Sequence, residues 1–343
     1  FLIREVFMDS DTHSGVISAV WGLRGQNPSP TAYAAEAREL VAALDSPSRL
    51  LIQGGVLPNE PGALEFMEVQ ARDYGVNAWK LYPQWGPDGV GFLMDDPELG
   101  LPFLERVREL KVPIVAAHRG LSLSFFRDEL ESALPLQDKY ADPTDIARVA
   151  AMYPDITFIC YHSGFEPTVV EGPYDPDNPQ GMDRFIKAAL EKGLQPNRGN
   201  LYAELGSLWR DKMGKPDEAA HVMGKLLKYF GEERILWGTD CIWYGSPQDQ
   251  IMALRAFEIS EEFQERYGYP ALTPLRKAKI FGLNGAALHN LDVSSMIQAR
   301  MDDPVGQLRA EYLQQPDPSF LTYGPRTRRD FLTLRNQTRG RPD

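Results

Sequence analysis

The chain has 343 residues, with 36 lysine and arginine against 48 aspartate and glutamate residues, which gives a formal net charge of −12 at pH 7. This acidic balance argues against nucleic acid as a partner, because phosphate binding needs a basic surface, and no apolar run approaches the roughly 20 residues of a membrane span. The 43% of hydrophobic residues suffices for a large core, and the two cysteines, Cys160 and Cys241, suit buried free thiols in a cytoplasmic protein.

Short apolar runs alternate with amphipathic segments along most of the chain. Residues 1–8 resemble the end of a helix with no strand before it. The runs are apolar without alternation, as expected for parallel strands buried on both faces of a sheet. The predicted strands lie at 14–23, 49–57, 76–83, 112–120, 155–164, 199–207 and 234–240, and the predicted helices at 31–45, 62–75, 102–111, 143–154, 182–193, 217–231 and 247–258.

This order of elements predicts an α/β fold. Seven strand–helix units and the helix end at residues 1–8 sum to eight, which favours a distorted (β/α)8 TIM barrel whose first strand lies upstream of Phe1. A doubly wound sheet is the alternative, but no glycine-rich phosphate turn follows the first strands. We expect the barrel over residues 1–293 and a polar C-terminal extension or oligomerisation arm over 294–343.

Five predicted strands end in a residue type that binds metals or transfers protons. Barrel enzymes place their chemistry at the carboxyl ends of the strands, and these ends carry Lys80, His118, His162, Glu204 and Asp240. Imidazole and carboxylate together suit zinc, iron or manganese better than calcium or magnesium. We therefore predict His118, His162 and Asp240 as metal ligands, with Asp240 also a general base. Hydrogen-bonded core histidines are the structural alternative.

The roles of the other candidates stay open. Lys80 is a carbamylated bridge between two metals, a substrate clamp or a salt-bridged structural residue. Glu204 suits substrate contact and structural support equally, and Arg119 suits a substrate carboxylate or a surface position. Aromatic side chains near strand ends, including Tyr82 and Trp243, are candidates for lining a substrate pocket. A further histidine, His221, is predicted to face solvent from the helix at 217–231.

The segments AAHRG, CYHSGF, YAELGS, LWGTDCIWYGSP and KAKIFGLNGAALHNLDV resemble the amidohydrolase superfamily, in the amidohydrolase-related branch that includes decarboxylases of the aminocarboxymuconate-semialdehyde type. The resemblance runs over about residues 1–293. It implies a metal held by a His-x-His pair on the first strand, by one or two later histidines and by an aspartate on the last strand. His118, His162 and Asp240 match the later ligands. No two histidines here are two residues apart, so we expect the pair upstream of Phe1; a divergent subunit with part of its site lost is the alternative.

The resemblance implies a metal-dependent hydrolase or decarboxylase, the latter a lyase, that cleaves a C–N or C–C bond of a small carboxylated substrate. A divalent metal, zinc before iron or manganese, would activate a water. Asp240 would take the water's proton, and His162 would bind the metal or polarise the substrate. The alternatives are a dinuclear iron or manganese oxygenase and a non-catalytic partner subunit of an active paralogue. We also expect a homo- or hetero-oligomer.

Overall fold

The computed structural model describes residues 2–20, 22–27, 29–44, 49–120, 138–241, 243–299, 303–318 and 327–338. Seven parallel strands form one sheet, and each strand pairs with its neighbour in the chain. At the edges of this sheet the strands are short, and the last one has two residues where seven were predicted. The strands are β1 Gly15–Ile17, β2 Leu50–Val56, β3 Ala78–Leu81, β4 Ile114–His118, β5 Thr157–Tyr161, β6 Leu201–Glu204 and β7 Ile235–Leu236.

Helices follow the strands as the alternation predicted. Short helical turns occur at Ile3–Met8, Pro87–Gly89, Asp138–Tyr140, His162–Gly164 and Lys279–Leu283. Within the described ranges, no helix combines the length and the apolar character that crossing a membrane requires. The helices are α1 Thr31–Leu44, α2 Ala63–Asp73, α3 Gly100–Leu110, α5 Thr144–Met152, α6 Met182–Glu191, α7 Leu208–Lys212, α8 Pro216–Tyr229, α9 Gln248–Ala256, α10 Glu261–Tyr267, α11 Pro274–Ala278, α12 Asn284–Leu288, α13 Val293–Ala299, α14 Pro304–Tyr312 and α15 Arg328–Thr338.

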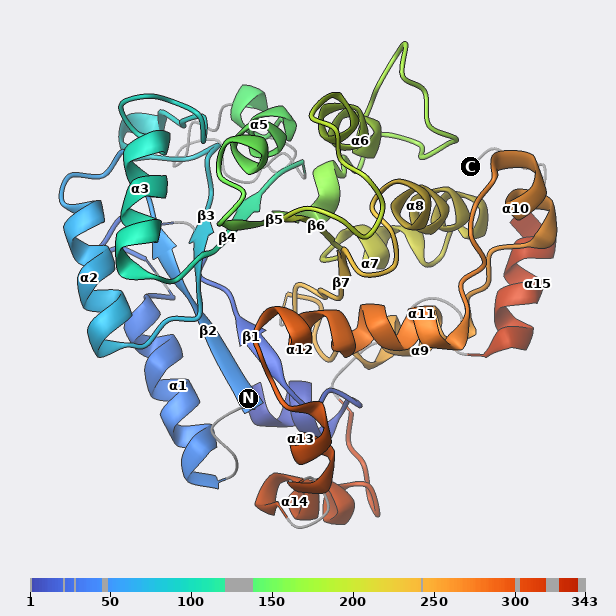
Figure 1. Ribbon diagram of the computed structural model, residues 1–343. Coiled ribbons are helices and arrows are strands. Elements are labelled where there is room, and N and C mark those ends of the chain that lie inside the picture. The colour runs from blue at the N-terminus through green and yellow to red at the C-terminus, as the bar shows by residue number, and fades with distance from the viewer. Residues whose placement is uncertain are drawn as a thin grey trace.

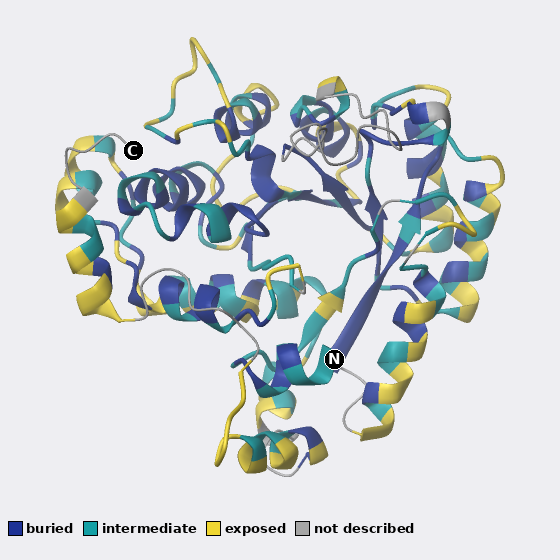
Figure 2. Ribbon diagram, turned by 180° about the vertical axis from the view of Figure 1, so that it is seen from behind, coloured by how far each residue is buried: buried dark blue, intermediate teal, exposed yellow. Residues whose placement is uncertain are grey.

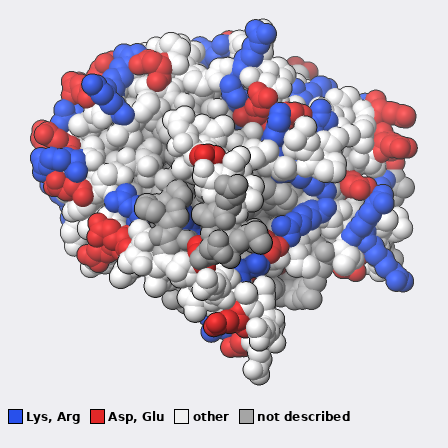
Figure 3. Space-filling model, turned by 60° about the horizontal axis from the view of Figure 1, so that its bottom comes forward, with Lys and Arg blue, Asp and Glu red and all other residues white. Residues whose placement is uncertain are grey.

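The sheet curls into a half-barrel with helices along its outer side (Figure 1). This arrangement confirms the prediction of a distorted (β/α)8 type of barrel. Seen from behind, the strands are mostly buried, and the outer helices are buried toward the sheet and exposed away from it (Figure 2). Charged side chains of both signs are interspersed over the face in Figure 3, so the net negative charge is not gathered in one place on that face.

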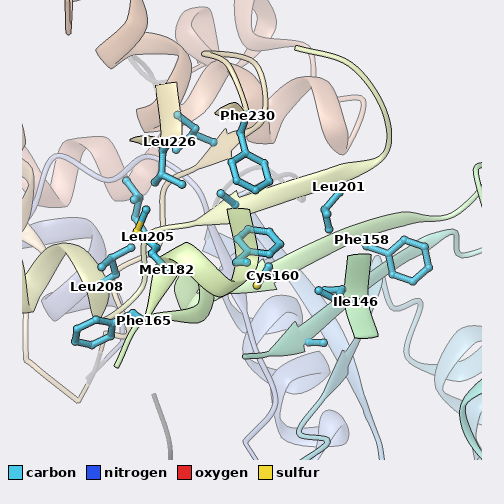
Figure 4. Packing of buried hydrophobic residues seen from close by; sticks show 14 of the residues in the cluster. Ile146, Phe158, Cys160, Phe165, Met182, Leu201, Leu205, Leu208, Leu226 and Phe230 are labelled. Atoms are coloured by element: carbon cyan, nitrogen blue, oxygen red, sulfur yellow. The ribbon is translucent and has the colours of Figure 1, made fainter. Parts of the chain in front are cut away.

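The main core lies between the strands and the outer helices. Phe158 and Cys160 of β5 point to this side and pack with Leu201 of β6 and Phe230 (Figure 4). Strand residues alternate between the two faces of a sheet, so Ile159 points the other way, into a smaller cluster with Ala78 and Ala116. Cys160 is a buried free thiol as predicted. Cys241 is only half-buried, because it lies in the turn after β7 and not inside a strand.

Two helices of the predicted extension, α14 and α15, pack against the barrel. Asp303, which caps α14, pairs with the buried Arg49 at 3.0 Å, and Phe331 of α15 packs edge-on against Phe257. These contacts anchor α14 and α15 on the same chain. Residues 300–302, 319–326 and 339–343 lie outside the described ranges, and a role of the extension in oligomerisation stays a prediction.

The prediction that His221 faces solvent is wrong. Its side chain is 7% exposed, and its Nδ1 lies 2.9 Å from the hydroxyl of Tyr269. The rings of Phe263 and Tyr267 lie 4.9 and 4.8 Å from the imidazole. The segment around α10 folds back over α8, and this long-range packing is invisible in the helical period of α8 itself.

Burial makes His221 a source of pH-dependent stability. Burial, together with the nearby cations Lys225 and Arg266, lowers the pKa of His221 to about 4. The unfolded chain therefore takes up a proton on this ring before the folded chain does, so stability is lost as the pH falls from about 6.5 to about 4. Over this range we expect His221 to cost wild type on the order of 2 kcal/mol in the free energy of unfolding. The His221→Gln variant should not show this decrease. Urea denaturation at successive pH values measures it, and parallel wild-type and variant curves would contradict it.

Candidate active site

Polar side chains form the layer above the small inner cluster. Lys80 follows Ala78 by two positions on β3, His118 follows Ala116 on β4, and Tyr161 follows Ile159 on β5. Residues two apart on a strand share one face, so all three side chains point to the inside of the curled sheet. The pairing of β4 with β5 sets His118 beside Tyr161. The carboxyl ends of neighbouring strands thus bring these residues together, as the sequence predicted for Lys80 and His118.

His162 lies in the turn that leaves β5 and contacts His118. Its Nε2 lies 3.1 Å from Nδ1 of His118, and its Nδ1 lies 2.8 Å from the carbonyl oxygen of Gly206. A carbonyl only accepts hydrogen bonds, so Nδ1 of His162 carries the proton. Burial lowers the pKa of His162 and keeps the ring neutral. The lone pair on Nε2 therefore accepts from the Nδ1–H of His118.

The turn at His162 has a left-handed backbone conformation. His162, Ser163 and Gly164 have φ of 66°, 51° and 74°, and Asp240 has φ of 50°. Non-glycine residues adopt this region only where the surroundings hold them there, and such sites cluster at functional centres. Here the hydroxyl of Ser163 bonds to both the backbone carbonyl and the backbone N–H of Glu204, which ties the turn to β6.

Glu204 supports the same turn. Its carboxylate accepts the backbone N–H of His162 at 3.0 Å and that of Gly206 at 2.7 Å. Burial raises its pKa to about 8, and the nearby Asp240 adds to the shift. Of the two predicted roles, the structure favours structural support over substrate contact.

Gly238 leaves room for the Glu204 carboxylate. A Cβ added at Gly238 would lie 1.3 Å from Oε1 of Glu204. We expect Gly238→Ala to lower the free energy of unfolding by about 3 kcal/mol, because Glu204 must leave its two backbone donors. Gly285→Ala is the matched control, since nothing lies within 4 Å of that position. Chemical denaturation measures the free energy of unfolding of both variants. Equal values would show that the site tolerates the displacement of Glu204.

Asp240 closes the cluster from the segment that follows β7. Its Oδ2 lies 3.6 Å from Nδ1 of His162 and accepts a hydrogen bond from the hydroxyl of Ser207. That hydroxyl also lies 3.1 Å from the hydroxyl of Tyr244. The neighbouring Trp243 is 73% exposed, so the structure leaves this predicted pocket residue at the surface.

Lys80 is buried between two tyrosine rings. Its Nζ lies 4.2 Å from the ring centre of Tyr82 and 4.1 Å from that of Tyr161. Within the described part of the chain, this Nζ has no hydrogen-bond partner. Burial lowers the pKa of Lys80 to about 7, against the opposing attraction of Asp240 and Glu204. The Tyr82 ring also lies 5.0 Å from the His118 ring, so Lys80 adjoins the histidine pair.

Sequence reasoning missed three residues that orient the site. Gln53 donates to the hydroxyl of Tyr161 at 2.9 Å, and Ser207 holds Asp240. The two-residue alternation along β5 is the signal that would have found Tyr161, because it places the ring on the same face as Ile159. No comparable signal marks Gln53 or Ser207, whose partners are distant in the sequence.

Arg119 does not join the cluster. Its guanidinium pairs with Asp145 at 2.6 Å and donates to the carbonyl of Tyr140 at 2.9 Å, with no exposed surface. Asp145 also accepts the backbone N–H of Met94. The predicted contact of Arg119 with a substrate carboxylate is therefore not supported, because its guanidinium already pairs with Asp145 of α5. Its partner lies 26 residues away, beyond the reach of local pattern.

The three predicted metal ligands lie in a row. His118 contacts one ring nitrogen of His162, and Asp240 faces the other. Because the two nitrogens of an imidazole point in diverging directions, one ion does not reach all three side chains in this arrangement. Within the described ranges, no group of three or more His, Cys, Asp or Glu side chains is placed to hold a metal ion. These residues as they stand do not fit a single-ion site, and metal binding stays a prediction.

Comparison with known proteins places the chain in a family. No curated protein matches it. The TIM-barrel protein Bb4693 from Bordetella bronchiseptica is 17% identical, with a TM-score of 0.52 over 80% of this chain and 77% of that one. The 2,6-dihydroxybenzoate decarboxylase from Rhizobium is 18% identical, with a TM-score of 0.43 over 76% and 75%. A manganese-bound dihydroxybenzoic acid decarboxylase from Polaromonas sp. JS666 is 18% identical, with a TM-score of 0.45 over 84% and 82%. These likenesses concern the fold alone.

The family model described as amidohydrolase matches residues 23–291, most of the sequence, and the chain therefore belongs to the amidohydrolase family.

Proposed function

We propose that the protein is an enzyme that cleaves a C–N or C–C bond of a small carboxylated substrate, by hydrolysis or decarboxylation. The observation that supports this most strongly is the row formed by Asp240, His162 and His118, held by left-handed backbone at the carboxyl end of the sheet. Buried, hydrogen-bonded imidazoles beside a carboxylate are suited to proton transfer. The residues around this row, Glu204 and Ser207, serve to orient it.

Each member of the row has a part in the proposed reaction. Asp240 accepts a proton from the attacking water in hydrolysis and returns it to the leaving group. In decarboxylation the bond to the carboxyl carbon breaks and carbon dioxide leaves. Asp240 passes a proton taken from solvent water to the carbon left behind. Nδ1 of His162 lies 3.6 Å from Asp240, so the N–H that it donates to Gly206 also faces the charge of that carboxylate without a hydrogen bond to it. His118 donates a hydrogen bond to Nε2, the other nitrogen of that ring, and so holds the ring in its orientation.

A substrate panel tests this function. The full chain is incubated with small carboxylated amides, esters and phenolic acids, and mass spectrometry follows cleavage and the release of carbon dioxide. We expect turnover in one of these classes, lost in His162→Gln and kept in His289→Gln, a histidine of the region around α12 that lies outside the row. Turnover that survives His162→Gln would place the chemistry elsewhere. A panel without turnover would favour the non-catalytic partner subunit.

Elemental analysis tests the predicted cofactor separately. One zinc per purified chain would support a metal-dependent hydrolase or decarboxylase. It would also call for ligands besides His118, His162 and Asp240, which do not fit a single ion as they stand. Two iron or manganese ions per chain would favour the oxygenase instead. Turnover by a chain stripped with a chelator and confirmed to lack metal would contradict a metal-dependent reaction.

A further inference from the structure

In the part of the chain that the structure describes, Lys80 is a buried lysine without a hydrogen-bond acceptor. Among the described residues, Lys212 and Lys225 are buried to the same degree, and each has carboxylate partners. Lys225 lies 2.6 Å from Glu171, and Lys212 lies 2.7 Å from Glu218. A buried ammonium is costly without hydrogen bonds. The Nζ of Lys80 has none within the described ranges, although its side chain is 2% exposed.

The two acids whose charges attract Lys80 accept hydrogen bonds from other groups. Glu204 accepts two backbone N–H groups, from His162 and Gly206, and Asp240 accepts from Ser207. Both acids attract Lys80 over a distance, but neither is a hydrogen-bond partner of its Nζ. The donors of the ammonium are therefore left for a group that the described part of the chain does not provide.

The aromatic rings around Lys80 adjoin the proposed catalytic row. The Tyr161 ring is held by Gln53, whose amide oxygen accepts from Ser18 at 2.9 Å. The Tyr82 ring adjoins both Lys80 and His118, at 4.2 Å from Nζ to the ring centre and 5.0 Å between the two ring centres. The tyrosine faces stabilise a cation in part but accept no full N–H hydrogen bond. An anion bound to Nζ would thus lie beside the histidine pair, between aromatic walls.

We propose that Lys80 binds the carboxylate of the substrate and so positions the reacting carbon beside His118 and His162. This inference rests on the function proposed above and assigns to Lys80 the role that the sequence suggested for Arg119. The ammonium gains the acceptor that it lacks, and the carboxylate gains a charge-assisted hydrogen bond in a water-poor site. The tyrosine walls favour an acid with a flat or apolar body.

Benzoate is the probe for the test, because it joins one carboxylate to a flat apolar ring. Calorimetry and thermal unfolding at constant ionic strength compare wild type, Lys80→Met and Lys187→Met, the last a control that removes a surface lysine. We expect benzoate to bind wild type and Lys187→Met equally and to raise their unfolding midpoints. Lys80→Met should bind at least about tenfold more weakly. Without benzoate, its midpoint should equal or exceed that of wild type, since methionine removes an unpaired buried charge.

Equal benzoate affinity of wild type and Lys80→Met would overturn the inference, and so would a wild type that binds no benzoate. A carbamate on Lys80 in the intact mass would also overturn it, because the modified side chain is an anion. Should Lys80→Met fail to fold, the ¹³Cε resonance of Lys80, assigned with Lys80→Gln, must shift on benzoate addition to wild type. These measurements need no turnover. If Lys80 fails them while His162→Gln abolishes turnover, the proposed function stands and only this inference is wrong.

Discussion

Replacing Asp240 with asparagine is expected to lower turnover by about a thousandfold or more while the fold is retained. Asparagine has the size of aspartate, and its amide oxygen still accepts from the hydroxyl of Ser207. The amide neither takes a proton from water nor carries the charge that faces Nδ1 of His162 at 3.6 Å. The loss should therefore fall on kcat more than on KM.

Steady-state kinetics on a substrate from the panel measures this loss, with circular dichroism to confirm the fold. Ser207→Ala is the comparison variant, because it removes only the group that orients Asp240. We expect its kcat to fall less than that of Asp240→Asn. Near-normal turnover by Asp240→Asn would refute Asp240 as the central acid and base.

Lys225→Met is expected to lower the free energy of unfolding by about 3–5 kcal/mol. The Nζ of Lys225 lies 2.6 Å from Glu171 and 2.7 Å from Asp183, and all three side chains are buried. Glu171 also accepts the backbone N–H of Met182, and Asp183 that of Asp175. Removing the lysine leaves two buried carboxylates without a cation, which costs far more than the lost contacts themselves.

Lys215→Met is the matched control for this loss. Lys215 is 38% exposed in its side chain and lies 3.6 Å from Asp211, so its ion pair is screened by water. We expect its removal to cost less than about 1 kcal/mol. Urea denaturation of both variants measures the difference. A loss of similar size in the two would show that burial adds nothing to the Lys225 network.

The fold was predictable because its signals are local. Each predicted strand is an apolar run, and each is present, although β7 keeps only Ile235 and Leu236. The residues at the strand ends, such as His118 and Asp240, were found because a polar side chain that ends a buried strand has no packing role there. Their convergence follows from parallel pairing, which brings all carboxyl ends to one side of the sheet.

The errors arose where partners are far apart in the sequence. For Arg119 the sequence left a substrate carboxylate and a surface position open, but the side chain is buried and its guanidinium pairs with Asp145 of α5. His221 was placed toward solvent because α8 alone shows only its own period, and Tyr269 covers it from another segment. The arrangement of His118, His162 and Asp240 in a row depends on the carbonyl of Gly206 and on left-handed backbone, and residue types alone do not encode either.

The pH dependence of kcat/KM for wild type and His162→Gln, on one substrate from the panel, tests the central claim most directly. If Asp240 transfers the proton while His162 and His118 hold the site in place, His162→Gln loses about a thousandfold in kcat/KM at the pH where wild type is fastest. His289→Gln should follow the wild-type profile. A His162→Gln variant with the rate and profile of wild type would contradict the account.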